Sequence, residues 1–145
     1  MTVHILKMAV GVESVEHLRH IQSERLSSLK MLGDPPVLRH WTRNKPKRIN
    51  EIIYGGSLYW IIKGSIRVRQ RILKIESRSD IETNKKCGFV LDASVVLTIP
   101  RPARPIQGWR YLEEGSAPRD VVESSGSFDE MPEDMAKELR ELGLL

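Results

Sequence analysis

Residues 54–77 read YGGSLYWIIKGSIRVRQRILKIES, and this stretch decides the expected fold. After Gly55-Gly56 comes a block of aromatic and β-branched residues, which is typical of a strand with apolar side chains on both faces. Lys63-Gly64 then predicts a tight turn into a second strand over residues 65–75. The stretch therefore predicts a pair of strands, the first of them in the core.

The second strand carries Arg67, Arg69 and Arg71 on one face. On the opposite face lie the apolar residues Ile66, Val68 and Ile72. At about 3.3 Å per residue, alternate arginines stand roughly 6.6 Å apart, a spacing that suits successive backbone phosphates. Three guanidinium groups on one face also repel one another, so pairing with acidic side chains is an equally good interpretation. The sequence leaves both interpretations open.

The chain before this stretch shows a strand pattern and then a helix pattern. Residues 2–12 have apolar side chains on both faces, which indicates a buried strand. A helix is expected over residues 14–32, with Ser14 as its N-cap, because apolar residues recur at three- to five-residue intervals. Residues 37–50 contain Pro46 and are expected as a loop or edge strand. Residues 49–54 are predicted to be a short helical turn or strand.

The chain after this stretch alternates between polar and apolar segments. Residues 78–88 are polar and predict a hairpin loop, whereas residues 89–99 predict a further strand. Residues 100–105, PRPARP, are expected to be extended because of their three prolines. Residues 113–128 predict a loop that leads to a C-terminal helix over residues 132–142.

The composition is that of a soluble globular protein. The 145 residues are 40% hydrophobic and 29% charged, which fits a single α+β domain over residues 1–145. No apolar run approaches the roughly 20 residues that span a bilayer, and the N-terminus lacks the features of a signal peptide. Cys87 is the single cysteine, which fits a reducing compartment. We therefore expect a cytoplasmic protein without a membrane partner.

Basic residues concentrate in the middle of the chain. Residues 39–71 contain nine basic side chains against one acidic side chain, Glu51. From residue 111 to the C-terminus the balance reverses to three basic and ten acidic side chains. The basic middle is of the kind that attracts a polyanion. The other interpretation is that the acidic C-terminal segment folds back and neutralises it.

Aromatic side chains lie among these basic residues and again in residues 107–111, QGWRY, a second aromatic and basic cluster. Such a mixture offers charge for phosphates and rings for base stacking, although each ring can equally belong to the core. The candidate nucleic-acid-binding residues are Arg43, Lys45, Lys47, Arg48, Lys63, Arg67, Arg69, Arg71, Trp41, Trp109, Arg110 and Tyr111.

No residue pattern identifies a reaction. His17 and His20 share a helix face, but no third ligand has suitable spacing, so no metal site is predicted. Cys87 has no paired histidine or second cysteine, and Gly55-Gly56 lacks the spacing of a phosphate-binding loop. We predict no catalytic residue, no cofactor and no particular oligomeric state. The sequence favours a non-catalytic protein without deciding the question.

Two blocks, PKRINEIIYGGSLYWIIKGSIRVRQRI and QGWRYLEEGSAPRD, resemble an uncharacterised bacterial family defined as a domain of unknown function. The resemblance covers almost the whole chain and implies no activity. The early strand and helix, the glycine-led strand pair and the later strands are also similar to the PUA and ASCH-like group of small β-barrels. Many members of that group bind RNA or a nucleobase. This resemblance implies a small mixed β-barrel with an N-terminal and a C-terminal helix, and it assigns no binding residue.

The leading hypothesis is a non-catalytic nucleic-acid-binding module, for RNA rather than DNA, so the expected partner is RNA or another polyanion. The alternative is a small enzyme that acts on a nucleotide or another anionic small molecule. It would need a concave pocket in which a carboxylate or histidine faces the arginines. A third hypothesis is a protein-interaction module that uses the acidic C-terminal segment.

Overall fold

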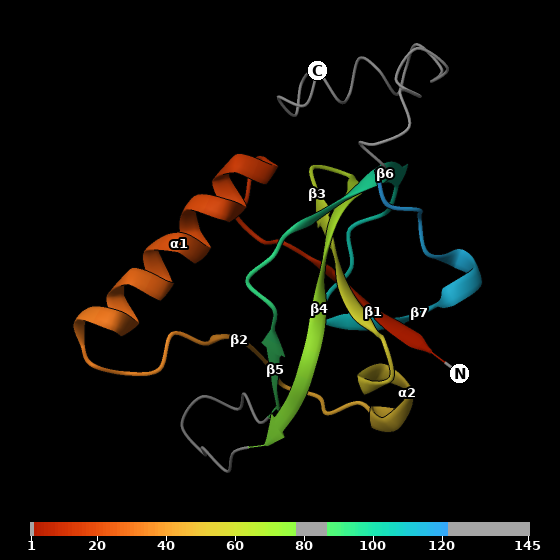
Figure 1. The fold of residues 1–145 in the computed structure, drawn as a ribbon. Coiled ribbons are helices and arrows are strands. Elements are labelled where there is room, and N and C mark those ends of the chain that lie inside the picture. Colours follow the sequence, from red (N-terminus) through yellow and green to blue (C-terminus); the bar gives the residue numbers. More distant parts are fainter. Residues whose placement is uncertain (1, 78–86, 122–145) are drawn as a thin grey trace.

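The computed structural model describes residues 2–77 and 87–121, and Figure 1 shows their arrangement. These residues form strands, helices and one 3-10 turn around a single sheet. The elements are β1 (Val3–Met8), α1 (Val15–Met31), β2 (Leu38–Thr42), α2 (Ile49–Ile53), β3 (Ser57–Ile62), β4 (Ser65–Ser77), β5 (Cys87–Leu91), β6 (Val96–Pro102), β7 (Trp109–Glu113) and η1 (Glu114–Ser116). Among the helices of the described residues, none combines the length and apolar character needed to cross a bilayer.

Strand β4 is the centre of the sheet, and with 13 residues it is long enough to pair with three others. The strand order is β2-β5-β4-β3-β1-β7, and β6 pairs with β4 outside this path. The β1–β3 pair is parallel, and the other pairs are antiparallel. The expected α+β class with a mixed sheet is confirmed, and residues 54–77 do supply its central strand pair.

The expected small β-barrel is not found, because the sheet is not closed and has open ends at β2 and β7. No strand ladder joins these ends within residues 2–77 and 87–121. They are linked instead by side-chain contacts, because Trp109 Nε1 donates to the carbonyl of Asn44 at 2.8 Å. Tyr111 likewise accepts from the backbone N–H of Lys47 at 2.8 Å. Residues from both of these ends line the cavity of the candidate site.

The first strand and helix follow the sequence prediction closely. Strand β1 lies between β3 and β7, so it is a buried strand and not an edge. The Ser14 hydroxyl accepts from the backbone N–H of His17 at 3.0 Å and caps α1. Helix α1 buries Val15, Leu18 and Gln22 against the sheet. Its C-terminal end extends away from the sheet in Figure 1.

The glycine pair before β3 has two separate roles. Gly55 has a φ of +84°, so it makes the turn, as predicted. At Gly56 a side chain would collide with the backbone carbonyl oxygens of Ile52 and Val3. The second glycine therefore allows α2, β1 and β3 to approach one another closely.

The β3–β4 hairpin contains a bulge that the alternating pattern did not predict. Its Lys63-Gly64 turn is confirmed, since both residues have positive φ. In the ladder Trp60 pairs with Val68 and Ile61 pairs with Ile66, so Arg67 is an extra residue. As a result Ile66 and Val68 belong to different clusters, one on each face of the sheet. The expected common face of Ile66, Val68 and Ile72 is wrong at this point.

The strand expected over residues 89–99 is wrong as a single element. It divides into β5 and β6, which pair with successive halves of the same edge of β4. Between them the Asp92 carboxylate accepts from the backbone N–H of Ser94 at 2.9 Å, which closes a local turn. A short polar side chain can satisfy the backbone in this way, so the pairing is interrupted there.

Several predicted segments lie outside the described residues. They are residues 78–86 of the predicted hairpin loop, the loop after residue 121 and the predicted helix over residues 132–142. The last described segment pairs with β6, because the backbone N–H of Val121 donates to the carbonyl of Leu97 at 2.9 Å. Residues 119–121 are thereby held on the sheet.

Candidate functional site

A cavity of about 690 Å³ lies between α1 and the open end of the sheet. Its walls come from the end of β1, from α1, from β2 with the residues that follow it, and from the start of β7. This volume is within the range of sites that hold a small ligand. The cavity lining contains four basic residues, Lys7, Arg25, Arg39 and Arg43, and three tryptophans, Trp41, Trp60 and Trp109.

The cavity is electrostatically positive. Its described lining contains no aspartate or glutamate. Arg39 is paired with Glu76 at 2.6 Å, whereas Arg25 and Arg43 are exposed and form no ion pair with a described residue. A concave surface lined by charge of one sign concentrates ligands of the opposite sign. A negatively charged ligand would therefore be favoured over a positively charged one in this cavity.

Two of the tryptophans were candidate stacking residues, and both line this cavity. The indole of Trp109 is fixed by its bond to Asn44 and by edge contacts with Tyr111 and Phe89, at centroid distances of 4.9 and 6.5 Å. Trp41 lies opposite Gly88 in the β2–β5 ladder. The absence of a side chain at Gly88 leaves room for the Trp41 ring, because a Cβ there would stand 2.8 Å from Trp41 Cζ3. Both rings are thus held in place by contacts within the fold.

A buried hydrogen-bond network supports one wall of the cavity. Gln22 and Gln70 exchange two hydrogen bonds, each of 2.8 Å, between their side-chain amides. Gln70 also accepts from Trp60 Nε1 at 2.9 Å and donates to the carbonyl of Asp92 at 3.1 Å. The network therefore connects α1 to β3, β4 and the turn after β5.

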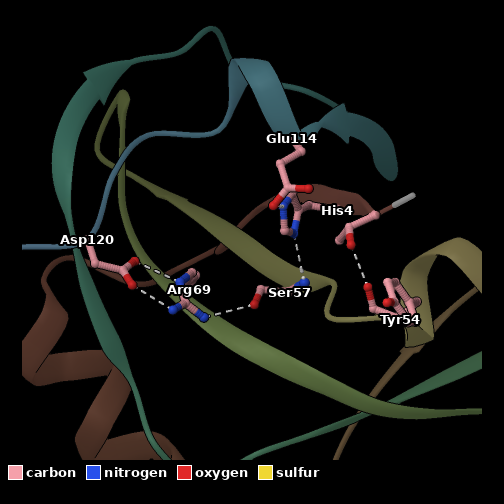
Figure 2. A network of polar contacts seen from close by, with 7 residues as sticks. His4, Tyr54, Ser57, Arg69, Glu114 and Asp120 are labelled. Carbon is pink, nitrogen blue, oxygen red and sulfur yellow. Dashed lines mark hydrogen bonds and ion pairs between the residues drawn. The ribbon is translucent and has the colours of Figure 1, made fainter.

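The three arginines of β4 do not form one basic row. Arg69 donates to both carboxylate oxygens of Asp120, at 2.7 and 2.6 Å, and to Ser57 Oγ at 3.0 Å. Figure 2 shows its guanidinium group between these two residues. Arg67 occupies the bulge and donates to the carbonyl of Ile62, and the exposed Arg71 donates to the carbonyl of Ile53. The three arginines therefore lie in three different environments, and the charge of Arg69 is neutralised by Asp120.

The same network holds the buried His4. Its Nδ1 accepts from the backbone N–H of Ser57 at 3.0 Å, and its Nε2 stands 4.0 Å from a carboxylate oxygen of Glu114 (Figure 2). Burial lowers the pKa of His4, and Arg69 also lowers it, whereas Glu114 opposes the shift. A neutral imidazole that accepts at Nδ1 carries its proton on Nε2. These contacts give His4 a structural role.

The remaining candidates lie apart from the cavity. Arg48 forms ion pairs with Glu51 and Glu113, both at 2.7 Å, and its guanidinium carbon stands 5.3 Å from the centre of the Tyr111 ring. The hydroxyl of Tyr111 is occupied by the backbone of Lys47 and Arg48. Lys63 pairs with Glu13 at 3.4 Å. Lys45, Lys47 and Arg110 are exposed outside the cavity lining.

The structure thus brings together Trp41, Arg43 and Trp109 of the predicted set, and it adds residues that sequence reasoning missed. The missed residues are Lys7, Gln22, Arg25, Arg39, His40 and Trp60 of the lining and Gln70 behind it. One sequence signal was available, because Gln70 stands between Val68 and Ile72 on the apolar face of its strand. A polar residue at such a position usually has a buried hydrogen-bond partner.

The other reactive side chains form no second site in the described chain. Nδ1 of His17 accepts from the backbone N–H of Glu13 at 3.1 Å, and His20 lies 3.7 Å from Glu24. Residues 2–77 and 87–121 contain no group of three metal-ligating side chains. The Cys87 thiol is buried, and burial raises its pKa.

Comparison with known proteins gives a family and no activity. A family model described as a protein of unknown function, DUF1489, matches residues 5–145. This confirms the resemblance to an uncharacterised family, whereas the similarity to PUA and ASCH-like proteins is not confirmed. No curated protein and no solved structure matches the chain.

Proposed function

The chain belongs to DUF1489, a family of proteins of unknown function, and we propose that it binds single-stranded RNA with one nucleotide in the cavity beside α1. The base would stack on Trp41 or Trp109, and phosphates would meet Arg25 and Arg43. The observation that carries the proposal is the combination of tryptophan rings and basic residues in one cavity whose described lining has no carboxylate.

Single-stranded RNA fits this combination better than a duplex does. Sequence-tolerant proteins of this kind pair a positive groove with aromatic side chains on which exposed bases stack. Bases in a duplex are already stacked, so they cannot enter a cavity without being extruded. The neutralised Arg69 and the divided row on β4 favour the cavity as the binding surface over the strand face.

The second candidate is an enzyme or receptor for a free nucleotide or a similar small anion. One observation favours it, because the basic surface is concave and His40 lines it together with Arg25, Arg39 and Arg43. Catalysis would need an acid or base held in position. The described lining supplies His40 for this role, but it contains no carboxylate that could orient the histidine or act beside it. Affinity for mononucleotides as high as that for RNA would favour this second candidate.

The first experiment measures binding of fluorescent eight-nucleotide RNA to the full chain at several salt concentrations. Arg43→Ala is compared with Arg71→Ala, since both arginines are exposed and only Arg43 lines the cavity. We expect Arg43→Ala to weaken binding about tenfold and to reduce the salt dependence by about one phosphate contact. Arg71→Ala should change affinity less than about twofold. Absence of salt-dependent binding, or equal losses in both variants, contradicts the proposal.

A further inference from the structure

Gln22 is a buried polar side chain of the cavity, and its hydrogen-bonding groups are only partly used. It lies on α1, lines the cavity and is 7% exposed. A glutamine amide has two N–H donors and an oxygen with two lone pairs. Among the described residues, Gln22 uses one N–H and one lone pair, both toward Gln70. One donor and one acceptor position therefore remain.

The orientation of the Gln22 amide is fixed by its partners. Gln70 is 0% exposed, and its two donors and two acceptor positions are all occupied. The indole N–H of Trp60 can only donate, so the atom that it contacts in Gln70 must be the oxygen. That assignment fixes which atom of Gln22 is oxygen and which is nitrogen. Exchanging them would place donor against donor.

We infer that Gln22 reads the base of the nucleotide in the cavity, which is an inference that rests on the proposed RNA-binding function. A fixed donor and acceptor beside stacking rings distinguish bases, because bases differ in the groups at their edges. Gln22 also lines a second cavity of about 320 Å³, but the described lining of that cavity has no aromatic side chain. Of the two cavities that Gln22 lines, the larger is therefore the one that also offers a base aromatic rings for stacking.

The pairing with Gln70 also limits how strongly Gln22 can discriminate. A free glutamine amide can grip adenine with its oxygen and nitrogen together. In Gln22 that edge of the amide is occupied by Gln70. Gln22 can thus offer a single hydrogen bond from either remaining position. The expected preference between the best and the poorest base is about three- to tenfold.

The experiment measures the affinities of the four 5′-ribonucleoside monophosphates and of the single-stranded octamers of adenosine, cytidine and uridine. In the wild-type protein they should differ by about three- to tenfold among bases. Gln22→Met has a side chain of similar length without these hydrogen bonds, and it should reduce the differences to within about twofold. The salt dependence of octamer binding should stay unchanged, because the basic residues are untouched.

The outcomes separate the inference from the proposed function. If the wild-type protein binds neither octamers nor mononucleotides, the proposed function fails and the inference fails with it. If it binds octamers without a base preference, or Gln22→Met keeps the preference, only the inference is overturned. Thermal melting checks that each variant folds. Should Gln22→Met unfold, Gln22→Leu replaces it, since it also lacks the hydrogen-bonding groups of the amide and adds no charge, and an unchanged order of bases again overturns the inference.

Discussion

His4 shows how the surroundings of one residue set its chemistry. Its imidazole is buried, and burial holds its pKa below the ordinary value of 6.5. Nδ1 already accepts from the backbone N–H of Ser57. Protonating the imidazole at Nδ1 would set two N–H groups against each other. The folded protein therefore favours the neutral ring more than the unfolded chain does.

We expect the free energy of unfolding to fall as the pH decreases from 7 to 5. Below pH 6.5 the unfolded chain takes up a proton at His4 before the folded protein does, so stability rises with pH in this window. The stability that neutral His4 contributes is fully present above about pH 6.5, and it is lost as the pH falls through the lowered pKa of the folded protein. Urea denaturation at each pH measures it. Arg48 lowers the pKa of Glu51, and Arg39 lowers the pKa of Glu76. Protonation of these two carboxylates therefore lowers the stability further below pH 4.5, their ordinary pKa.

The control is His4→Asn, which offers an amide oxygen near the position of Nδ1 and does not titrate. Its stability at pH 7 should be lower than that of the wild type because the ring contact with Tyr59 is lost. Its stability should nevertheless vary less between pH 7 and pH 5. An equally steep decline in His4→Asn would show that another group causes the loss.

At the scale of the elements, the pairing of β2 with β5 positions the Trp41 wall of the cavity. Trp41 and Gly88 are direct partners in this ladder, and an added methyl group at Gly88 would stand 2.8 Å from the indole. We expect Gly88→Ala to cost about 1–3 kcal/mol of stability, as overpacking usually does. Because the ring must move, RNA binding should weaken as well. Urea denaturation and RNA titration measure the two effects.

Gly115→Ala is a suitable control for this substitution. A side chain at Gly115 meets no atom within 4 Å, and its φ lies outside the positive range. We therefore expect its stability and RNA affinity to match those of the wild type. If Gly88→Ala behaves like Gly115→Ala, the Trp41 ring is not held by the close approach at Gly88.

Most elements were predictable because their residue patterns are local. Ser14 capped the expected helix, Lys63-Gly64 made the expected turn, and the apolar faces of residues 2–12 indicated a buried strand. The bulge at Arg67 was not predictable, since the alternating pattern is the same with and without it. The break at Asp92 depends on its carboxylate accepting from the backbone N–H of Ser94, which strand periodicity does not reveal.

At the scale of the whole molecule, the candidate site was only partly predictable for a different reason. The cavity joins α1 to residues of β2, 13 to 24 positions later in the sequence, and to Trp109 of β7, 84 to 91 positions later. Residue types alone identified Trp41, Arg43 and Trp109 as candidates. They could not show that Asp120 neutralises Arg69, or that the sheet stays open between β2 and β7. Both facts depend on tertiary contacts between distant segments.

The acidic C-terminal segment lowers the net charge of the whole molecule. Residues 122–145 contain seven acidic and two basic side chains, so removing them changes the formal net charge from +4 to +9. We expect a chain that ends at Val121 to bind RNA several-fold more tightly at low salt, with a smaller difference at high salt. Val121 is kept because its backbone pairs with Leu97, and Asp120 is kept because it neutralises Arg69. RNA titration at two salt concentrations measures the effect.

A full-length control separates charge from folding. Asp129, Glu130, Glu133 and Asp134 are replaced by asparagine or glutamine, which removes four negative charges and keeps the length of the chain. If long-range charge causes the effect, this variant should bind RNA more tightly than the wild type, though less tightly than the shortened chain. If the shortened chain does not melt cooperatively, residues 122–145 are part of the folded core. The idea that they act as a separate interaction segment then fails. If both variants fold and bind RNA with wild-type affinity, the acidic segment does not compete with RNA for the basic cavity.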